Sequence, residues 1–223
     1  SQVSASPTAG FSVVTYTGNG TGGATVGHSL GAAPKMVITK NRSASANWLV
    51  YHETLGATKY LGLNQTISAQ TNIVAWNNTA PTNNVFSIGA DSSVNGSGNS
   101  MVAYCFSEVP GYSSFGSYVG NGSTDGPFVY LGFRPKFFLF KRSDSTSDWT
   151  TFDSERSSSN VVDDYLNPNQ SSAEFANNTA GVTLDFTSNG VKIRNTWQGI
   201  NANGATIIYM AFAENPFKNS LAR

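Results

Sequence analysis

The chain has 223 residues, of which only 12% are charged, and thirteen Lys and Arg balance thirteen Asp and Glu. This balance argues against a general binder of nucleic acid or of anionic membranes, because such proteins carry a basic patch. Cys105 is the single cysteine, so an intrachain disulfide is excluded, and its apolar surroundings predict a buried, inert thiol. No run of about 18 apolar residues is present, so we expect no membrane insertion.

The predicted elements are short strands separated by turns. The first ten residues are small and polar, and we expect a lead segment or linker there. No long stretch has a 3.6-residue period, whereas β-branched and aromatic runs bounded by Gly, Asn and Ser are typical of an all-β fold. In chain order, the clearest runs are "PKMVITK" (34–40), "WLVYH" (48–52), "NVFSIG" (84–89), "MVAYCFSEV" (101–109), "PKFFLFK" (135–141), "WTTFD" (149–153), "GVTLDFTSNGVKIRN" (181–195) and "ATIIYMAFAE" (205–214).

The chain repeats itself. "GAAPKMVITK" (31–40) and "GFRPKFFLFK" (132–141) share one pattern of Gly, Pro-Lys, apolar run and Lys. Further pairs follow in the same order: "YTGNGT" (16–21) with "YVGNGS" (118–123), Trp48 with Trp149, "KYLGLNQT" (59–66) with "DYLNPNQS" (164–171), "NNTA" (77–80) with "NNTA" (177–180), and "CFSEVP" (105–110) with "AFAENP" (211–216). Ordered matches with slowly drifting offsets indicate an internal duplication.

The duplication predicts two tandem pseudo-repeat, β-sandwich-like domains over residues 11–111 and 112–217, followed by a tail over 218–223. In the second repeat, Phe137, Phe138, Leu139 and Phe140 are apolar on both faces of a strand. A strand of that kind is expected to be central in its sheet, with all four side chains buried. We interpret the lysines that bracket the run as gatekeepers, which are charged residues that oppose aggregation through exposed strand edges.

Several phrases resemble a family of tailed-bacteriophage proteins. They are "GFSVVTYTGNGTGGATVGHSLGAAPKMVITK" (10–40), "MVAYCFSEVPGYSSFGSYVGNGSTDGPFVYLGFRPKFFLFKRSDSTSDW" (101–149) and "MAFAENPFK" (210–218). In that family the module is similar to the C-terminal part of a tail-fibre or other virion-surface protein. The resemblance implies a virion surface and a part in host recognition, and it supplies no catalytic residues.

Catalytic and metal-binding patterns are weak. Two histidines are too few for a histidine-based metal cluster, and no nucleophile elbow, phosphate-binding loop or paired-cysteine motif occurs. A glycosidase needs two facing carboxylates, but Glu108 and Glu214 recur singly at strand ends and predict solvated or ion-paired termini. Asp144, Thr146 and Asp148 alternate as ligands of hard cations sometimes do, although a polar loop tip is the preferred interpretation. We therefore expect no enzyme, no cofactor and no metal.

The tryptophans offer a binding hypothesis. Trp48 and Trp149 recur in both repeats and predict packing roles. Trp76 and Trp197 are specific to one repeat each and lie among polar residues, in "VAWNNT" and "NTWQGI". A sugar site needs an aromatic ring surrounded by neutral hydrogen-bonding groups. The glycan-binding candidates are Trp76, Trp197, Asn77, Asn195 and Gln198, with packing of both tryptophans as the alternative.

The sequence favours a non-enzymatic phage virion surface module, the distal adhesin of a tail fibre that binds host surface glycans. The alternative is a structural virion protein, such as a head fibre, decoration or assembly subunit, without glycan binding. Expected partners are a host cell-surface glycan and other virion subunits, including further copies of the chain, as a trimer if it forms a fibre. The expected location is the virion surface, outside the cell.

Overall fold

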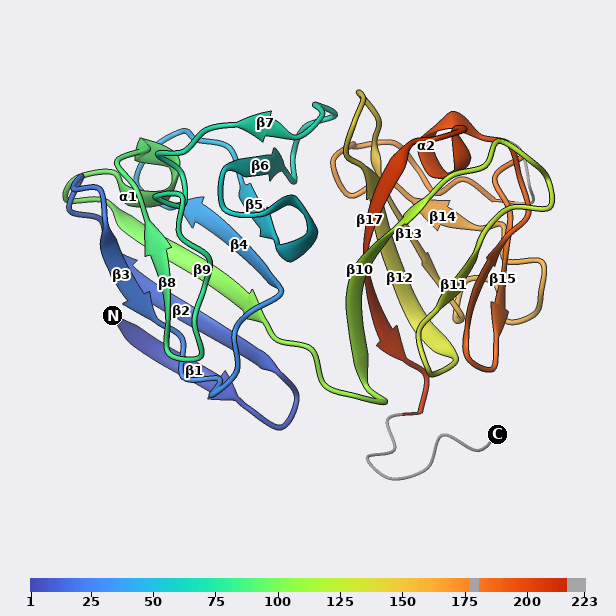
Figure 1. Ribbon diagram of the computed structural model, residues 1–223, viewed down its shortest axis with the longest axis horizontal. Helices are drawn as coiled ribbons and strands as arrows, with labels where there is room; N and C mark the ends of the chain where they lie inside the picture. Colours follow the sequence, from blue (N-terminus) through green and yellow to red (C-terminus); the bar gives the residue numbers. More distant parts are fainter. Residues whose placement is uncertain (177–180, 216–223) are drawn as a thin grey trace. The chain divides into compact units, whose positions relative to one another are not determined.

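The computed structural model describes residues 1–176 and 181–215 (Figure 1). It divides the chain into two compact units between Glu108 and Val109, close to the expected boundary after residue 111. The second "NNTA" phrase (177–180) and the expected tail (218–223) lie outside the described residues. No helix in the described part of the chain is both long and apolar enough to span a bilayer.

Unit 1 consists of an antiparallel sheet in the order β1-β2-β9-β4-β5-β6-β7 and a ribbon of β3 and β8. Its elements are β1 (Gln2–Ser6), β2 (Phe11–Thr17), β3 (Ala24–Gly27), β4 (Met36–Asn41), β5 (Leu49–His52), η1 (Glu53–Leu55), β6 (Lys59–Gly62), β7 (Gln70–Thr71), β8 (Val85–Ile88), α1 (Ser92–Asn95) and β9 (Ser100–Phe106). The core forms where Val14, Val37 and Cys105 of the sheet pack with Val26 and Phe86 of the ribbon. The prediction of a buried cysteine is confirmed, and burial raises the pKa of the Cys105 thiol to about 12.

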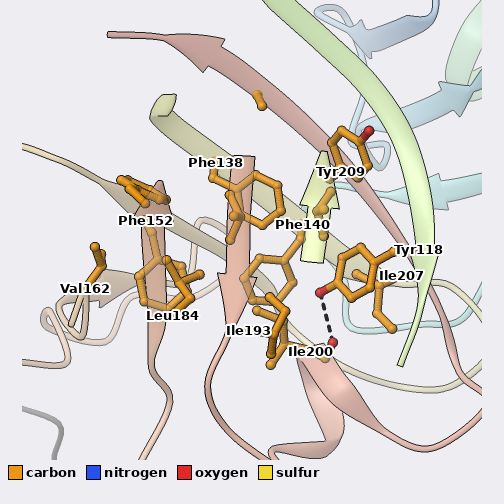
Figure 2. Packing of buried hydrophobic residues seen from close by; sticks show 14 of the residues in the cluster. Tyr118, Phe138, Phe140, Phe152, Val162, Leu184, Ile193, Ile200, Ile207 and Tyr209 are labelled. Atoms are coloured by element: carbon orange, nitrogen blue, oxygen red, sulfur yellow. Dashed lines mark hydrogen bonds between the residues drawn. The ribbon is translucent and has the colours of Figure 1, made fainter. Parts of the chain in front are cut away.

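Unit 2 has a sheet in the order β10-β17-β12-β13-β14 and a second sheet in the order β11-β16-β15. Its elements are β10 (Ser113–Val119), β11 (Phe128–Tyr130), β12 (Pro135–Arg142), β13 (Trp149–Asp153), β14 (Tyr165–Leu166), β15 (Leu184–Thr187), β16 (Gly190–Ile193), α2 (Gln198–Asn201) and β17 (Thr206–Ala213). Figure 2 shows the core, in which Phe138 and Phe140 of one sheet meet Leu184 and Ile193 of the other. The all-β fold with two sandwich-like repeats is therefore confirmed.

The two main sheets follow the same path. The order β2-β9-β4-β5-β6 in unit 1 corresponds to β10-β17-β12-β13-β14 in unit 2. The register agrees as well, because Val37 lies opposite Cys105 in one sheet and Phe138 lies opposite Ala211 in the other. The phrase "PKMVITK" and its copy thus form β4 and β12, each between two neighbouring strands. This is the central position that their apolar character predicts.

The structure corrects three details of the sequence-based prediction. Residues 1–10 are not a free lead segment, because β1 pairs with β2 from Gln2 opposite Thr15 to Ser6 opposite Phe11. Short polar strands give a weak sequence signal, and every side chain of β1 is exposed. Phe137 is half-buried rather than buried, whereas its three neighbours in the run are buried. Of the bracketing lysines, Lys141 is buried rather than a surface gatekeeper.

A buried asparagine explains the repeated "GNG" phrase in unit 1. Asn95, at the end of α1, is fully buried. Its side chain accepts a hydrogen bond from the Asn19 backbone N–H (2.8 Å) and donates to the Gly89 carbonyl (2.8 Å). Nearby, the Tyr16 hydroxyl donates to the Val94 carbonyl over 2.6 Å. These bonds satisfy buried backbone groups that no strand pairs.

Unit 2 repeats these three hydrogen bonds. Asn201, at the end of α2, accepts from the Asn121 backbone N–H (2.8 Å) and donates to the Asn195 carbonyl (2.8 Å). The Tyr118 hydroxyl donates to the Ile200 carbonyl over 2.9 Å (Figure 2). The repeated phrase therefore holds a loop to a short helix, and it serves the fold in both units.

Candidate functional site

The structure does not place Trp76 on the surface. Its side chain is only 2% exposed and packs edge-on against Tyr51, with ring centroids 6.0 Å apart. The polar residues after it form a turn in which Asn77 and Asn78 adopt positive φ angles of 52° and 46°. Asparagine tolerates that conformation, so these residues mark a turn rather than a sugar site. The prediction that Trp76 with Asn77 binds a glycan is wrong, because no ring face is open to a ligand.

Trp197 is half-buried and also packs inward. Its ring lies against Phe140 and Tyr165, each with centroids 6.4 Å away. Asn195 is buried, donates to the Thr183 carbonyl and accepts from the Trp197 backbone N–H. The polar surroundings of this tryptophan are thus mainly structural.

Gln198 is the member of the predicted set next to Trp197 whose side chain is exposed. Its backbone carbonyl accepts a hydrogen bond from Arg142. The structure therefore brings Trp197, Asn195 and Gln198 together, with a half-buried ring and one exposed polar side chain, that of Gln198.

The alternating residues of the second hairpin tip do not converge. The carboxylate of Asp144 faces the guanidinium of Arg142 with both oxygens, at 3.0 and 3.1 Å. Asp148 instead accepts hydrogen bonds from Asn169 and Gln170. Across residues 1–176 and 181–215, no three His, Cys, Asp or Glu side chains are grouped so that they could hold a metal ion. Thr146 is exposed at the same tip, which agrees with a polar loop.

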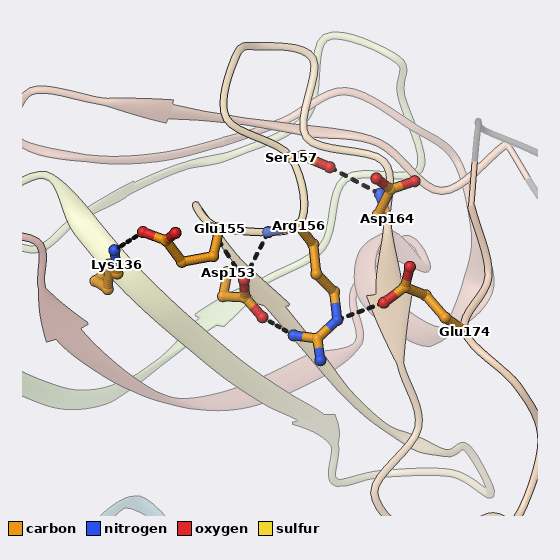
Figure 3. Close-up of polar contacts among 7 residues, drawn as sticks. All are labelled: Lys136, Asp153, Glu155, Arg156, Ser157, Asp164 and Glu174. Carbon is orange, nitrogen blue, oxygen red and sulfur yellow. Dashed lines mark hydrogen bonds and ion pairs between the residues drawn. The ribbon is translucent and has the colours of Figure 1, made fainter.

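The densest group of charges lies at the end of β13 (Figure 3). Arg156 bridges Asp153 and Glu174, and Lys136 pairs with Glu155. Asp153 also accepts from two backbone N–H groups of the turn that follows it. In unit 1, His52 has the corresponding place and caps its turn through Nδ1. The group is therefore an ion-pair network that closes a turn, and it presents no pair of facing carboxylates free for catalysis.

The open aromatic surface of unit 2 is on β11. Phe128 is 46% exposed and Tyr130 is 65% exposed, while Val129 between them is buried in the core. Alternation along a strand places both rings on the outer face of the small sheet. We call Phe128 and Tyr130 the aromatic platform. Two exposed aromatic side chains on one face of a strand make this strand the candidate binding surface of unit 2.

The platform lies low on the sheet because glycines lie beneath it. A Cβ atom added to Gly190 would be 2.9 Å from Cζ of Phe128, so the ring covers the position where a side chain would stand. A Cβ added to Gly132 would be 3.6 Å from the Tyr130 hydroxyl. An aromatic ring that covers a glycine on a neighbouring strand is a known way to shield the backbone. Phe128 is nevertheless 46% exposed.

Two ion pairs border the platform. Lys192 lies directly opposite Phe128 in the sheet and pairs with Asp125 at 2.6 Å. Arg194, two residues further on, pairs with Asp185 at 2.6 Å. The hydrogen bond from Lys192 lowers the pKa of the Asp125 carboxyl, so this carboxylate stays charged near neutral pH. The border is therefore polar but has no net charge.

Unit 1 lacks every part of this surface. Hydrogen bonds fix the correspondence, because the Gly23 N–H donates to the Ile88 carbonyl as the Gly126 N–H donates to the Ile193 carbonyl. Thr25 then corresponds to Phe128, and Gly27 to Tyr130. Their cross-strand neighbours are Ser87 and Val85, where unit 2 has Lys192 and Gly190.

Sequence reasoning missed the platform, although a signal exists. "PFVY" (127–130) alternates aromatic, aliphatic and aromatic residues, which predicts a strand with one open aromatic face. Its counterpart "ATVG" (24–27) keeps only the buried valine. A position-by-position comparison of the two repeats would have marked Phe128 and Tyr130 as an addition that the fold does not require.

Comparison with known proteins gives one family. Residues 1–216 match the model of a family described as Domain of unknown function (DUF7483). No curated protein and no solved structure matches the chain significantly. Because the match extends over nearly the whole chain, the protein belongs to the DUF7483 family.

Proposed function

We propose that this chain is a non-enzymatic module of a phage virion surface, the distal adhesin of a tail fibre that binds host surface glycans. The observation that carries the proposal is the aromatic platform, in which Phe128 is 46% and Tyr130 is 65% exposed on one strand. The sequence resemblance to virion-surface proteins supplies the biological setting. The proposed partners are a host glycan and other virion subunits, among them further copies of the chain, as a trimer in a fibre.

The chemistry of the surface suits sugars. A pyranose presents an apolar C–H face that stacks on an aromatic ring, while its hydroxyls form hydrogen bonds at the rim. Such a site is weak by itself, with a dissociation constant in the mM range, or about 4 kcal/mol. Several copies on one fibre raise the avidity by roughly 10²- to 10⁴-fold if they reach the surface together.

A second function rests on the same strand. β11 is an edge of its sheet and carries exposed aromatic side chains, which also fits a contact with another virion subunit. In that case the chain is a structural protein, such as a head fibre, decoration or assembly subunit, and binds no glycan. The two functions differ in whether the isolated protein recognises sugars.

A broad glycan array with the purified chain tests the proposal. The expected result is binding to a restricted set of glycans by the wild type, and its loss in the Phe128→Thr, Tyr130→Thr double variant. Val119→Thr is the matched control, since it removes a 60% exposed apolar side chain from β10, outside the platform. An array with no binding at all, together with self-association that the double variant abolishes, would favour the structural function.

A further inference from the structure

We infer that the aromatic platform takes an uncharged, flat glycan chain of β-linked pyranoses, bound along its length. This inference rests on the proposed glycan-binding function and names the class of ligand for the same site. It follows from two features of unit 2, the low position of the rings and the paired charges of the border. Unit 1 has neither of them.

The low position of the rings selects a flat ligand. Phe128 reaches across the sheet over Gly190, and the Tyr130 hydroxyl lies near Gly132, just beyond the end of the same strand. The two Cα atoms are about 7 Å apart, as is usual for positions i and i+2 of a strand. Two rings spread over a sheet in this way offer one extended surface. A chain of β-1,4-linked pyranoses with equatorial substituents is a flat ribbon with C–H faces on both sides, whereas an α-1,4-linked glucan coils away from such a surface.

The border selects an uncharged ligand. Lys192 is already paired with Asp125, and it also donates to the Gly126 carbonyl. Arg194 is already paired with Asp185. An anionic sugar would have to compete with a carboxylate for either cation, and a cationic sugar would have to compete with a cation for either carboxylate. Hydroxyl and amide groups can instead bond to these charged side chains without separating the pairs.

The open shape of the site favours internal stretches of the chain. The platform is on the surface of an edge strand, and both rings are about half exposed or more. A surface of this kind contacts several consecutive sugars from one side. Affinity is therefore expected to increase with oligomer length until the platform is covered.

Titration of the purified chain with defined oligosaccharides tests the inference. The probes are cellohexaose and N-acetylchitohexaose as flat uncharged chains, maltohexaose as a coiled uncharged chain, and hexagalacturonate as a charged chain. We expect at least one flat probe to bind, and the corresponding disaccharide to bind more weakly. The affinity should change less than twofold between 50 mM and 500 mM NaCl. Phe128→Thr with Tyr130→Thr should weaken binding at least about tenfold, because two stacking contacts are lost.

Val119→Thr is the matched control, because it removes an exposed apolar side chain that lies outside the platform, and it should bind as the wild type does. Binding of a flat probe that survives the double threonine variant would overturn the assignment of the site.

Further outcomes separate this inference from the proposed function. Platform-dependent binding of only maltohexaose, only hexagalacturonate or only other coiled or charged glycans on the array would overturn the ligand class and leave glycan recognition standing. Absence of binding to every probe and to the whole array would overturn both.

Discussion

Units 1 and 2 share the order of five strands in their main sheets, and they differ clearly at one pair of corresponding strands, β3 and β11. Both keep a buried valine there, Val26 on β3 and Val129 on β11. On either side of it, unit 1 has small residues and unit 2 has two exposed aromatic rings. What the units share is explained by packing and by buried hydrogen bonds. What only unit 2 possesses is not required by the fold, so it is the natural place to look for function.

The largest expected effect concerns the shared core. Phe138 is fully buried in unit 2, and Val37 is its fully buried counterpart in unit 1. Phe138→Ala should lower the free energy of unfolding of unit 2 by about 3–5 kcal/mol, through lost burial and a cavity. Val37→Ala removes less volume and should cost less. Chemical denaturation followed separately in each unit by amide exchange measures both, and a near-zero change for Phe138→Ala would contradict the described core.

The next effect concerns the buried asparagines. Asn201→Ala and Asn95→Ala each leave a backbone N–H and at least two carbonyls without their partner. Each should destabilise its own unit by about 2–4 kcal/mol, because unsatisfied buried groups cost roughly 1–3 kcal/mol apiece and water can reach some of them. Similar losses in the two units would support equivalent roles. A loss of stability in only one unit would show that the repeated phrase contributes differently to the stability of the two units.

A smaller effect is expected at the two tyrosines. Tyr118→Phe and Tyr16→Phe each remove one hydroxyl that donates to a helix carbonyl. We expect a loss of about 1 kcal/mol in each unit, the usual net value of one hydrogen bond. Thermal unfolding of both variants beside the wild type measures it. Stabilisation in either variant would mean that the hydroxyl is poorly accommodated.

A pH effect should distinguish the units. His28 of unit 1 is buried, its Nδ1 accepts from the Leu30 N–H, and its counterpart in unit 2 is Leu131. Burial lowers the pKa of His28 below the usual 6.5, so the unfolded chain takes up a proton more readily. The stability due to neutral His28 is therefore present above pH 6.5 and is lost as the pH falls through the region below it.

Comparison of the wild type with His28→Leu isolates the contribution of His28 to the pH dependence of stability. The difference in unfolding free energy should shift in favour of the variant between pH 7.5 and pH 5. Other titrating groups cancel, since they are common to both proteins. A difference that does not change with pH would show that His28 has the same pKa in the folded and unfolded chain.

Much of the fold could be predicted from the sequence. The duplication, the central strands and the buried cysteine follow from patterns that depend on neighbouring residues, such as apolar runs and repeated turn phrases. The strand β1 could not be predicted, because "QVSAS" buries no side chain and is held by backbone pairing alone. The exposure of Phe137 depends on which other segments of the chain cover its face of the sheet. A local sequence pattern does not contain that information.

The site was predicted less well than the fold, for a physical reason. Polar neighbours of a tryptophan indicate either a sugar site or a turn, and at Trp76 the positive φ angles of Asn77 and Asn78 show a turn. At Trp197 the neighbouring Asn195 is a buried hydrogen-bonding residue. The alternation in "PFVY" marks Phe128 and Tyr130 as one face of a strand, but that this face is the outer one is known only once Val129 is placed in the core.

The most direct test of a binding surface in unit 2 alone is a map of amide chemical shifts during titration with cellohexaose or N-acetylchitohexaose. Shifts should be confined to residues 126–132 and 185–194, around the platform and its border. Residues 24–27, the equivalent strand of unit 1, should not move, and neither should Trp76. Shifts centred on unit 1, or on the Trp197 loop with none on β11, would contradict the assignment of the site to Phe128 and Tyr130.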